Sequence, residues 1–291
     1  MDWSAKSPAH FPNSGAAPRA ASNYNDSLLF EFQLERIQVV LVSPRNPLNI
    51  GAAARAMANF GIRRLAVVAP HEAHWREAKS AVGAPDLLAD ARETGTLAEA
   101  ISNCTFVIGT GTLAHRKPEE PAVALPDLAP IVRRELAGGG QVAVVFGSEK
   151  RGLTGEDLSH CHLLVEIPTD PRQPSMNLGQ AVAVCLYALS TRVSSKTQTS
   201  GALDLDFETR ERVNPDGPPA TSGDLDLLAE VIEKTMRAAN YSPSVMQDAN
   251  RHDTRVLLRR LTLTRRDTRR ILGLFRRILW RLTHNTGDSH Q

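Results

Sequence analysis

The sequence has little cysteine, no long apolar run and no apolar signal-peptide core after Met1. Its 291 residues include three cysteines, and none of them belongs to a C-x-x-C pair. This excludes a disulfide scaffold and a cysteine-based zinc cluster, and we expect no metal site. The longest apolar run, 181–189, is much shorter than the ~20 residues that a membrane-spanning helix needs. These absences predict a cytoplasmic protein without membrane contact.

The composition is that of an ordinary globular protein. Hydrophobic residues make up 42% of the chain and charged residues 23%, which is enough apolar material to bury a core. At the usual ~150 residues per domain, the length predicts about two domains.

The small net charge of +2 conceals a basic block near the C-terminus. Between Arg251 and Arg281 the chain has eleven arginines and two aspartates, so this segment has a net charge of +9 and the rest has −7. Such asymmetry favours a polyanionic partner, with nucleic acid the first candidate. The alternative is a solvated helical face without a partner.

Short apolar segments rich in β-branched residues alternate with helical patterns from about residue 36 onward. We predict strands at 37–43, 64–69, 105–109, 141–146 and 163–167. We predict helices at 51–60 (capped by Asn49), 72–82, 97–102, 128–136 and 177–190. This alternation predicts an α/β fold with a parallel sheet and helices on both faces.

Composition divides the chain into four segments. We expect a disordered extension over 1–35, an α/β domain over 36–190, a linker over 191–223 and a small basic helical domain over 224–284. The last helix is amphipathic, because an apolar stripe of Ile271, Phe275, Ile278 and Leu282 faces away from Arg270, Arg277 and Arg281.

Polar and glycine-rich loops follow the predicted strands. The first strand leads into a loop and helix containing Asn49 and Arg55, which suit an anionic ligand but also an N-cap and a surface ion pair. The third strand ends in Gly109-Thr110-Gly111-Thr112, formally the start of a dinucleotide fingerprint. Pro118 and Pro121 prevent the helix that such a site requires. The intervening His-Arg-Lys run suits phosphate contacts, or is simply a solvated charge run.

Two further loops have the same character. The fourth strand runs into Phe146-Gly147-Ser148-Glu149, where paired glycines let the backbone approach a ligand and Glu149 is a candidate hydrogen-bond acceptor or base. The fifth strand ends at Ile167-Pro168 and leads to Pro174-Ser175-Met176-Asn177. Ser175 and Asn177 are candidate ligands, although helix capping explains them as well.

Together these segments resemble a known family. The ordered set N-x-G-x-x-x-R, F-G-S-E-x-x-G-L and I-P with P-S-M-N-L is similar to the SPOUT RNA 2′-O-methyltransferases, whose α/β domain ends in a trefoil knot. The segment NPLNIGAAARAMANFG and the appended helical domain most resemble the TrmJ-type tRNA methyltransferases. A catalytically inactive RNA-binding relative is the alternative from another class.

The resemblance implies the cofactor and the site residues. S-adenosylmethionine is expected in a knot pocket lined by Thr110, Gly111, Thr112, Gly147, Ile167, Pro174, Ser175, Met176 and Asn177. Catalytic roles fall to Arg55, Asn49 and Glu149. RNA contacts fall to Arg116, Lys117, Arg151, Arg270, Arg277 and Arg281.

The resemblance also implies the substrate and the assembly. The expected reaction transfers a methyl group to a ribose 2′-hydroxyl in tRNA, at the pyrimidine of anticodon-loop position 32, with rRNA or another tRNA site as the alternative. The need for a 2′-hydroxyl excludes DNA. A homodimer is expected, for which the apolar face of 181–189 supplies either the interface or the core of the monomer.

Elementary chemistry limits the role of Arg55. The family motif gives this residue the catalytic position, yet a guanidinium with a pKa above ~12 is almost never neutral at pH 7. We therefore expect a cationic Arg55 that stabilises the developing alkoxide and anchors the adjacent phosphate, while Glu149, water or phosphate accepts the proton.

Overall fold

The computed structural model describes residues 34–112, 120–190, 217–241 and 243–284. Within these ranges a seven-stranded sheet has the order β3-β2-β1-β6-β4-β7-β5, and every neighbouring pair is parallel. The strands are β1 (Ile37–Val42), β2 (Arg64–Val68), β3 (Arg92–Thr94), β4 (Phe106–Thr110), β5 (Ala122–Ala124), β6 (Val142–Phe146) and β7 (Leu163–Glu166). The predicted parallel α/β sheet is confirmed.

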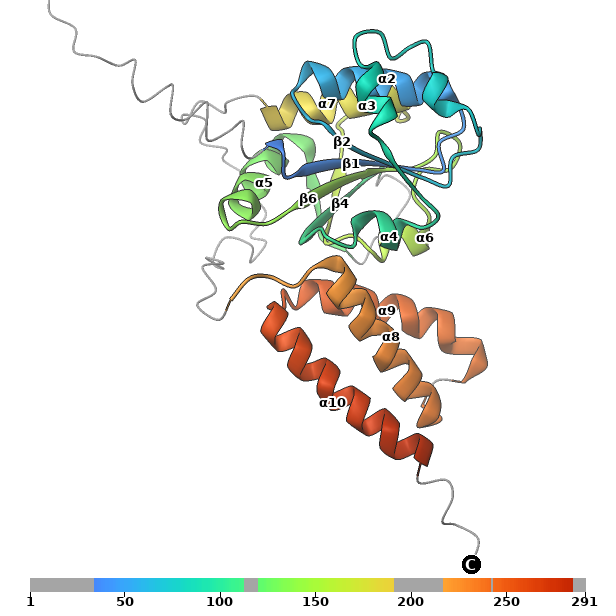
Figure 1. The fold of residues 1–291 in the computed structure, drawn as a ribbon, viewed down its shortest axis with the longest axis vertical. Helices are drawn as coiled ribbons and strands as arrows, with labels where there is room; N and C mark the ends of the chain where they lie inside the picture. The colour runs from blue at the N-terminus through green and yellow to red at the C-terminus, as the bar shows by residue number, and fades with distance from the viewer. Residues whose placement is uncertain (1–33, 113–119, 191–216, 242, 285–291) are drawn as a thin grey trace, which may run out of the picture.

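Helices cover both faces of this sheet (Figure 1). One face carries α2 (Pro47–Asn59), α3 (Pro85–Ala89), α5 (Leu128–Ala137) and α7 (Leu178–Ser190), and the other carries α4 (Leu97–Ile101) and α6 (Gly155–Leu158). Alternate residues of each central strand serve the two cores: Val39 and Leu41 of β1 face α2 and α7, whereas Val40 faces α4. All six residues of β1 are buried, including the polar Gln38, whose side chain donates to the carbonyl of Ala100; this burial is typical of a parallel strand covered on both faces.

Most of the apolar face of α7 belongs to the core of the monomer and is therefore not available for a dimer interface. Val182, Cys185, Leu186 and Leu189 are buried within the chain's own core. Val184 is the exception, with 36% of its surface exposed.

Several predicted local elements are wrong. Helix α2 begins earlier than expected, because Asn46 and not Asn49 is its N-cap: the Asn46 side chain accepts a hydrogen bond from the backbone N–H of Leu48. Pro47 occupies the first turn, where its missing N–H costs nothing. The helix predicted over 72–82 is reduced to a single 3₁₀ turn, η1 (Trp75–Glu77). Four further elements were not predicted from the sequence, each of them five residues long or shorter: β3, β5, α3 and α6.

The C-terminal part forms a small helical bundle of α8 (Ser222–Ala238), α9 (Gln247–Arg260) and α10 (Arg265–His284). Leu228 and Ala229 of α8 pack against Leu258 of α9, which the sequence analysis did not predict as a separate helix. The start of α8 is fixed to the sheet domain, because the backbone N–H of Ser222 donates to the carbonyl of Cys104. The predicted apolar stripe of α10 is only partly covered, and Ile278 remains 38% exposed.

Part of the predicted organisation falls on residues outside the described ranges. This holds for nearly all of the predicted N-terminal extension, for 191–216 of the predicted linker and for 113–119 after β4. The trefoil knot stays a prediction. In the described part of the chain, no helix combines the length and apolar character required to cross a membrane. No cluster of three or more His, Cys, Asp or Glu side chains in that part is placed to hold a metal ion.

Candidate active site

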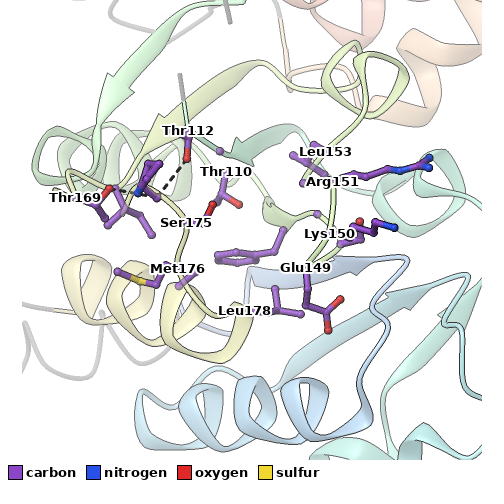
Figure 2. Close-up of a pocket in the computed structure, with 18 residues that line it drawn as sticks. Thr110, Thr112, Glu149, Lys150, Arg151, Leu153, Thr169, Ser175, Met176 and Leu178 are labelled. Atoms are coloured by element: carbon purple, nitrogen blue, oxygen red, sulfur yellow. Dashed lines mark hydrogen bonds between the residues drawn. The ribbon is translucent and has the colours of Figure 1, made fainter. Parts of the chain in front are cut away.

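A cavity of about 370 Å³ lies at the carboxyl ends of β4, β6 and β7. This is the edge at which ligands of parallel α/β sheets usually bind, and the volume lies in the range of small-molecule sites. Three chain segments form its walls: residues 110–112 after β4, residues 146–153 at the end of β6, and residues 167–178 between β7 and α7. Figure 2 shows Thr110 and Thr112 near Ser175 on one side, with Lys150 and Arg151 on the other.

Most of the predicted cofactor positions meet at this cavity. Eight of the nine line it: Thr110, Gly111, Thr112, Gly147, Ile167, Pro174, Ser175 and Met176. The ninth, Asn177, is adjacent in sequence but does not line the cavity. Residues from three separate sequence segments are thus brought to one place, although their role in binding stays a prediction.

Glycine is required at the turn after β6. A Cβ atom on Gly147 would lie 2.0 Å from the carbonyl carbon of Gly152 and 2.2 Å from the backbone nitrogen of Leu153. Both are backbone atoms, so a side chain at Gly147 cannot be accommodated without moving the loop. Gly111, in contrast, has open space where its side chain would be. At Gly111 and Gly147 the cavity is therefore lined by backbone atoms without side chains, which a ligand can approach closely.

Two threonine hydroxyls stabilise the cavity wall formed by residues 167–178. Thr112 and Thr169 both donate to the carbonyl oxygen of Pro174, at 3.4 and 3.3 Å. The loop before α7 is thereby connected to the end of β4 (Figure 2). These hydroxyl protons are consequently not directed at a ligand.

Glu149 binds the loop that precedes α2. Its carboxylate accepts hydrogen bonds from the backbone N–H groups of Arg45 (2.9 Å) and Asn46 (3.1 Å) and from the Asn49 side-chain amide (2.9 Å). Although burial raises the pKa of Glu149, these hydrogen bonds outweigh it and hold the pKa below its ordinary value. The carboxylate is therefore ionised at neutral pH and accepts hydrogen bonds along both oxygens.

Asn49 connects two motifs that are far apart in the sequence. Its side-chain nitrogen donates to Glu149, and its side-chain oxygen accepts from the Asn177 amide at 2.9 Å. The Asn177 oxygen in turn accepts the backbone N–H of Gly179 at 2.9 Å, at the start of α7. A continuous network thus joins α2, the loop after β6 and α7.

Arg55 lies apart from this network. It is exposed on α2 and does not line the cavity. Within the described residues it has no hydrogen bond or ion pair, so its guanidinium is free to bind another group.

Comparison with known proteins identifies the family. A family model described as the SpoU rRNA methylase family matches residues 36–187, which is more than half of the chain. The chain belongs to the SpoU rRNA methylase family. The predicted RNA methyltransferase is thereby confirmed, and so is the resemblance drawn from the three motifs.

Individual relatives of this SpoU-family chain agree with the assignment. The tRNA (cytidine/uridine/adenosine-2′-O-)-methyltransferase TrmJ of Pseudomonas aeruginosa is 37% identical over 204 residues, covering 70% of this chain and 78% of the relative. The tRNA (cytidine-2′-O-)-methyltransferase TrmJ of Methanocaldococcus jannaschii is 38% identical over 162 residues, covering 54% and 68%. The crystal structure of TrmJ from Z. mobilis ZM4 superposes with a TM-score of 0.69 at 27% identity, covering 83% of this chain and 98% of that one.

The basic block divides into two groups of arginines. On α9, Arg251 pairs with Glu233 (3.0 Å), Arg255 with Glu156, and Arg259 with Asp226 (2.7 Å). These three arginines form ion pairs within the SpoU-family chain. The net charge of +9 is therefore larger than the positive charge that is available to bind a partner. Of the predicted RNA contacts, Arg151 lines the cavity, and three are exposed on α10: Arg270, Arg277 and Arg281. Arg116 and Lys117 fall outside the described residues.

Sequence reasoning missed several residues at the cavity. Lys150 lies between two predicted positions, Glu149 and Arg151, and was overlooked although it belongs to the same motif. Leu178 is the last residue of the third motif, and Thr169 lies between its two parts, Ile167-Pro168 and Pro174–Leu178; both line the cavity as well. Their place in or beside a motif was the only sequence signal, since each has an ordinary residue type for a loop or helix.

Proposed function

We propose that this SpoU-family methylase is an S-adenosylmethionine-dependent tRNA 2′-O-methyltransferase that acts on the pyrimidine at anticodon-loop position 32. The names of the two TrmJ relatives support a tRNA ribose as the substrate. The observation that carries the proposal is the cavity bounded by the three motif loops, with the Asn49–Glu149–Asn177 network beside it. A tRNA substrate also implies a cytoplasmic location.

The cavity fits the proposed cofactor. Its volume of about 370 Å³ is suitable for a molecule of this size. The bare backbone at Gly111 and Gly147 suits the edge of an adenine and a ribose, and Ile167 and Met176 offer apolar contact. When bound there, S-adenosylmethionine supplies an electrophilic methyl group attached to a sulfonium.

Glu149 is a positioning residue in this proposal and not the base. Three donors already occupy its carboxylate, and its lowered pKa makes it a weak proton acceptor at neutral pH. Its hydrogen bonds to Arg45, Asn46 and Asn49 fix the start of α2 and the residues before it against the loop that lines the cavity. The cavity wall and the start of α2 are thereby held in one geometry, as in-line methyl transfer requires.

Arg55 provides the positive charge. Its guanidinium is permanently cationic and has no partner in the described part of the chain, so it can bind a substrate phosphate and stabilise the alkoxide that forms on the 2′-oxygen. The proton leaves to water or to a phosphate oxygen.

A homodimer is part of the proposal. Arg55 does not reach the cavity of its own chain, so a second copy is the natural way to bring it to a cofactor. Exposed apolar side chains on α2 and α7 are available for such an interface: Leu48 (54% exposed), Val184 (36%) and Tyr187 (60%). Tyr187 is held in place by an edge-on contact with Phe60.

The test is the transfer of labelled methyl groups from S-adenosylmethionine to unmodified tRNA and, separately, to rRNA. Wild type is compared with Arg55→Ala and with Arg63→Ala, which removes an exposed arginine next to the start of β2, at the opposite edge of the sheet. We expect label in tRNA that is lost only in Arg55→Ala, while binding of S-adenosylhomocysteine measured by calorimetry is unchanged in both variants.

The position is tested with a tRNA that contains 2′-deoxycytidine at position 32. Loss of transfer to this substrate supports the assignment, and undiminished transfer means that another site is modified. Label in rRNA alone would make the chain an rRNA methylase. Cofactor binding without transfer to either RNA would make it an inactive RNA-binding relative.

A further inference from the structure

Helix α10 has one face that packs and one that does not. Ile271 and Leu272 contact the small core formed by α8 and α9, and Thr268 is buried. At about 100° per residue, the opposite face forms a continuous stripe along five turns. The stripe consists of Arg266, Arg269, Arg270, Gly273, Arg276, Arg277, Trp280, Arg281 and His284, all of them exposed. We call this set the arginine stripe; Figure 1 shows α10 at the outer edge of the bundle.

The arginines of the stripe lack acidic partners. On α9, three arginines are neutralised by Glu233, Glu156 and Asp226. None of the six stripe arginines has an ion pair with a carboxylate in the described ranges. Such an uncompensated row of guanidinium groups is complementary to a row of phosphates.

Trp280 lies on this charged face near the C-terminal end of α10, between Arg277 and Arg281. A tryptophan on an amphipathic helix normally belongs to the packing side, yet Trp280 is 45% exposed. The Arg277 guanidinium lies 4.7 Å from its ring centre, and that of Arg281 lies 5.8 Å away. The His284 ring is stacked on the indole at 4.9 Å with an interplanar angle of 20°. The indole is thus already arranged to stack with planar groups.

Gly273 interrupts the stripe two turns before Trp280. Glycine in a helix interior costs about 1 kcal/mol relative to alanine, and packing does not require it here, because a Cβ atom at this position would meet nothing within 4 Å. The residue leaves exposed backbone between Arg270 and Arg276, where a partner can approach the helix axis closely.

We propose that Trp280 stacks on an unpaired nucleobase of the RNA substrate, while the stripe arginines bind the phosphates on either side. The base takes the place of the His284 ring, and Arg277 stays on the indole. Aromatic stacking requires an accessible base face, so the partner is a loop or another single-stranded segment and not a continuous duplex. This inference rests on the proposed function insofar as the substrate is RNA.

The composition of the stripe favours RNA over a lipid surface. A helix that lies on a membrane inserts a broad apolar face, whereas Ile271 and Leu272 of α10 pack against the bundle and, of its aliphatic side chains, only Leu274 and Ile278 are exposed. The exposed face carries one indole among six guanidinium groups, which is the combination of stacking ring and phosphate binders found in single-strand binding sites.

The test uses full-length variants and unmodified tRNA. We expect Trp280→Ala and Trp280→Leu to raise the Kd for tRNA, and the KM for tRNA in methyl transfer, by roughly 5- to 100-fold, with kcat within about twofold. Trp280→Phe keeps most of the affinity. The matched control is Tyr241→Ala, which removes an exposed aromatic residue that does not lie on α10. Arg277→Ala lowers the slope of log K against log salt by about one, and Trp280→Ala leaves the slope unchanged.

A spectroscopic measurement follows the stacking directly. Trp75 is fully buried, and Trp3 is replaced by phenylalanine, so Trp280 is the exposed emitter in this background. We expect oligouridylate to quench its emission and an RNA hairpin with a closed stem to do so far less. The quenching is absent in Trp3→Phe/Trp280→Phe.

The outcomes separate this inference from the proposed function. Wild-type transfer to tRNA together with unimpaired binding by Trp280→Ala would refute the stacking and leave the enzyme assignment standing. Wild-type affinity in Trp280→Leu would also refute it, because apolar bulk would then suffice. Weakened binding in Trp280→Ala, with no methyl transfer by the wild type, would overturn only the proposed function.

Discussion

A buried ion pair between α8 and α9, which His160 of the sheet domain also contacts, allows a quantitative prediction. The Arg259 side chain is 1% exposed, and its Nη2 donates to Asp226 Oδ1 at 2.7 Å. The Nδ1 atom of His160, two residues after α6, lies 3.3 Å from the same Nη2. Replacing Arg259 with methionine keeps an unbranched, flexible side chain but removes the guanidinium and its charge. The Asp226 carboxylate, 17% exposed, is then left without its main counter-charge.

The magnitude follows from two independent arguments. Breaking a buried ion pair by removing one partner typically costs about 3–5 kcal/mol, and the partial exposure of Asp226 favours the lower end. The pKa of Asp226 gives a second value. Burial raises this pKa, but the hydrogen bond from His160 and the charge of Arg259 lower it from 3.8 to about 2. That difference corresponds to about 2 kcal/mol of stability, to which His160 and Arg259 both contribute.

The sign of the pH dependence is fixed by the direction of the shift. The pKa of Asp226 is lower in the folded protein than in the unfolded chain. Ionised Asp226 therefore adds to the free energy of unfolding above about pH 4, and this stabilisation is lost as the pH falls toward 2. The groups facing this carboxylate are Arg259 and His160. In Arg259→Met the depression is reduced, so stability falls less over this pH range than it does in the wild type.

The assay is urea unfolding at pH 7 and pH 3, with Arg260→Met as the matched control because this neighbouring arginine is exposed. We expect Arg259→Met to lose about 3 kcal/mol at pH 7 and Arg260→Met to stay within about 0.5 kcal/mol of the wild type. Equal stability of the two variants at pH 7 would refute the reasoning. Adding Asp226→Asn to Arg259→Met is expected to recover part of the loss, since it removes the unpaired charge.

Three further predictions concern other parts of the chain. Gly147→Ala is expected to abolish binding of S-adenosylhomocysteine in calorimetry, because the added Cβ collides with the backbone at Gly152; retained affinity would contradict the required backbone approach. Gly273→Ala is expected to stabilise α10 by about 1 kcal/mol in urea unfolding, since alanine favours the helix and nothing obstructs its Cβ. The cysteine thiols should not react with a disulfide reagent at pH 8 until the protein is denatured, because burial raises the pKa of each of them; rapid native labelling would refute this for Cys104, Cys161 and Cys185.

The sequence by itself determined the class of fold and the segments of the site. Short apolar segments rich in β-branched residues, alternating with helical patterns, indicated strands covered on both faces and hence a parallel sheet with helices on either side. Parallel strands end at a common edge of the sheet, and the family resemblance assigned the motif loops after β4, β6 and β7 to one site there. The fold class depends on local residue type and the site on recognisable motifs, and both are present in the sequence.

Only the tertiary structure decided what individual polar side chains do. Asn49 has a residue type that is common at helix N-caps, but Asn46 is the N-cap of α2. Asn49 instead forms hydrogen bonds with Glu149, 100 positions away in the sequence, and with Asn177, 128 positions away. Arg259 and Arg260 are indistinguishable as neighbours in a basic run, yet one is buried on Asp226 and the other is exposed. The partner of a polar group is set by which distant segment packs against it, and this information is not present in local sequence.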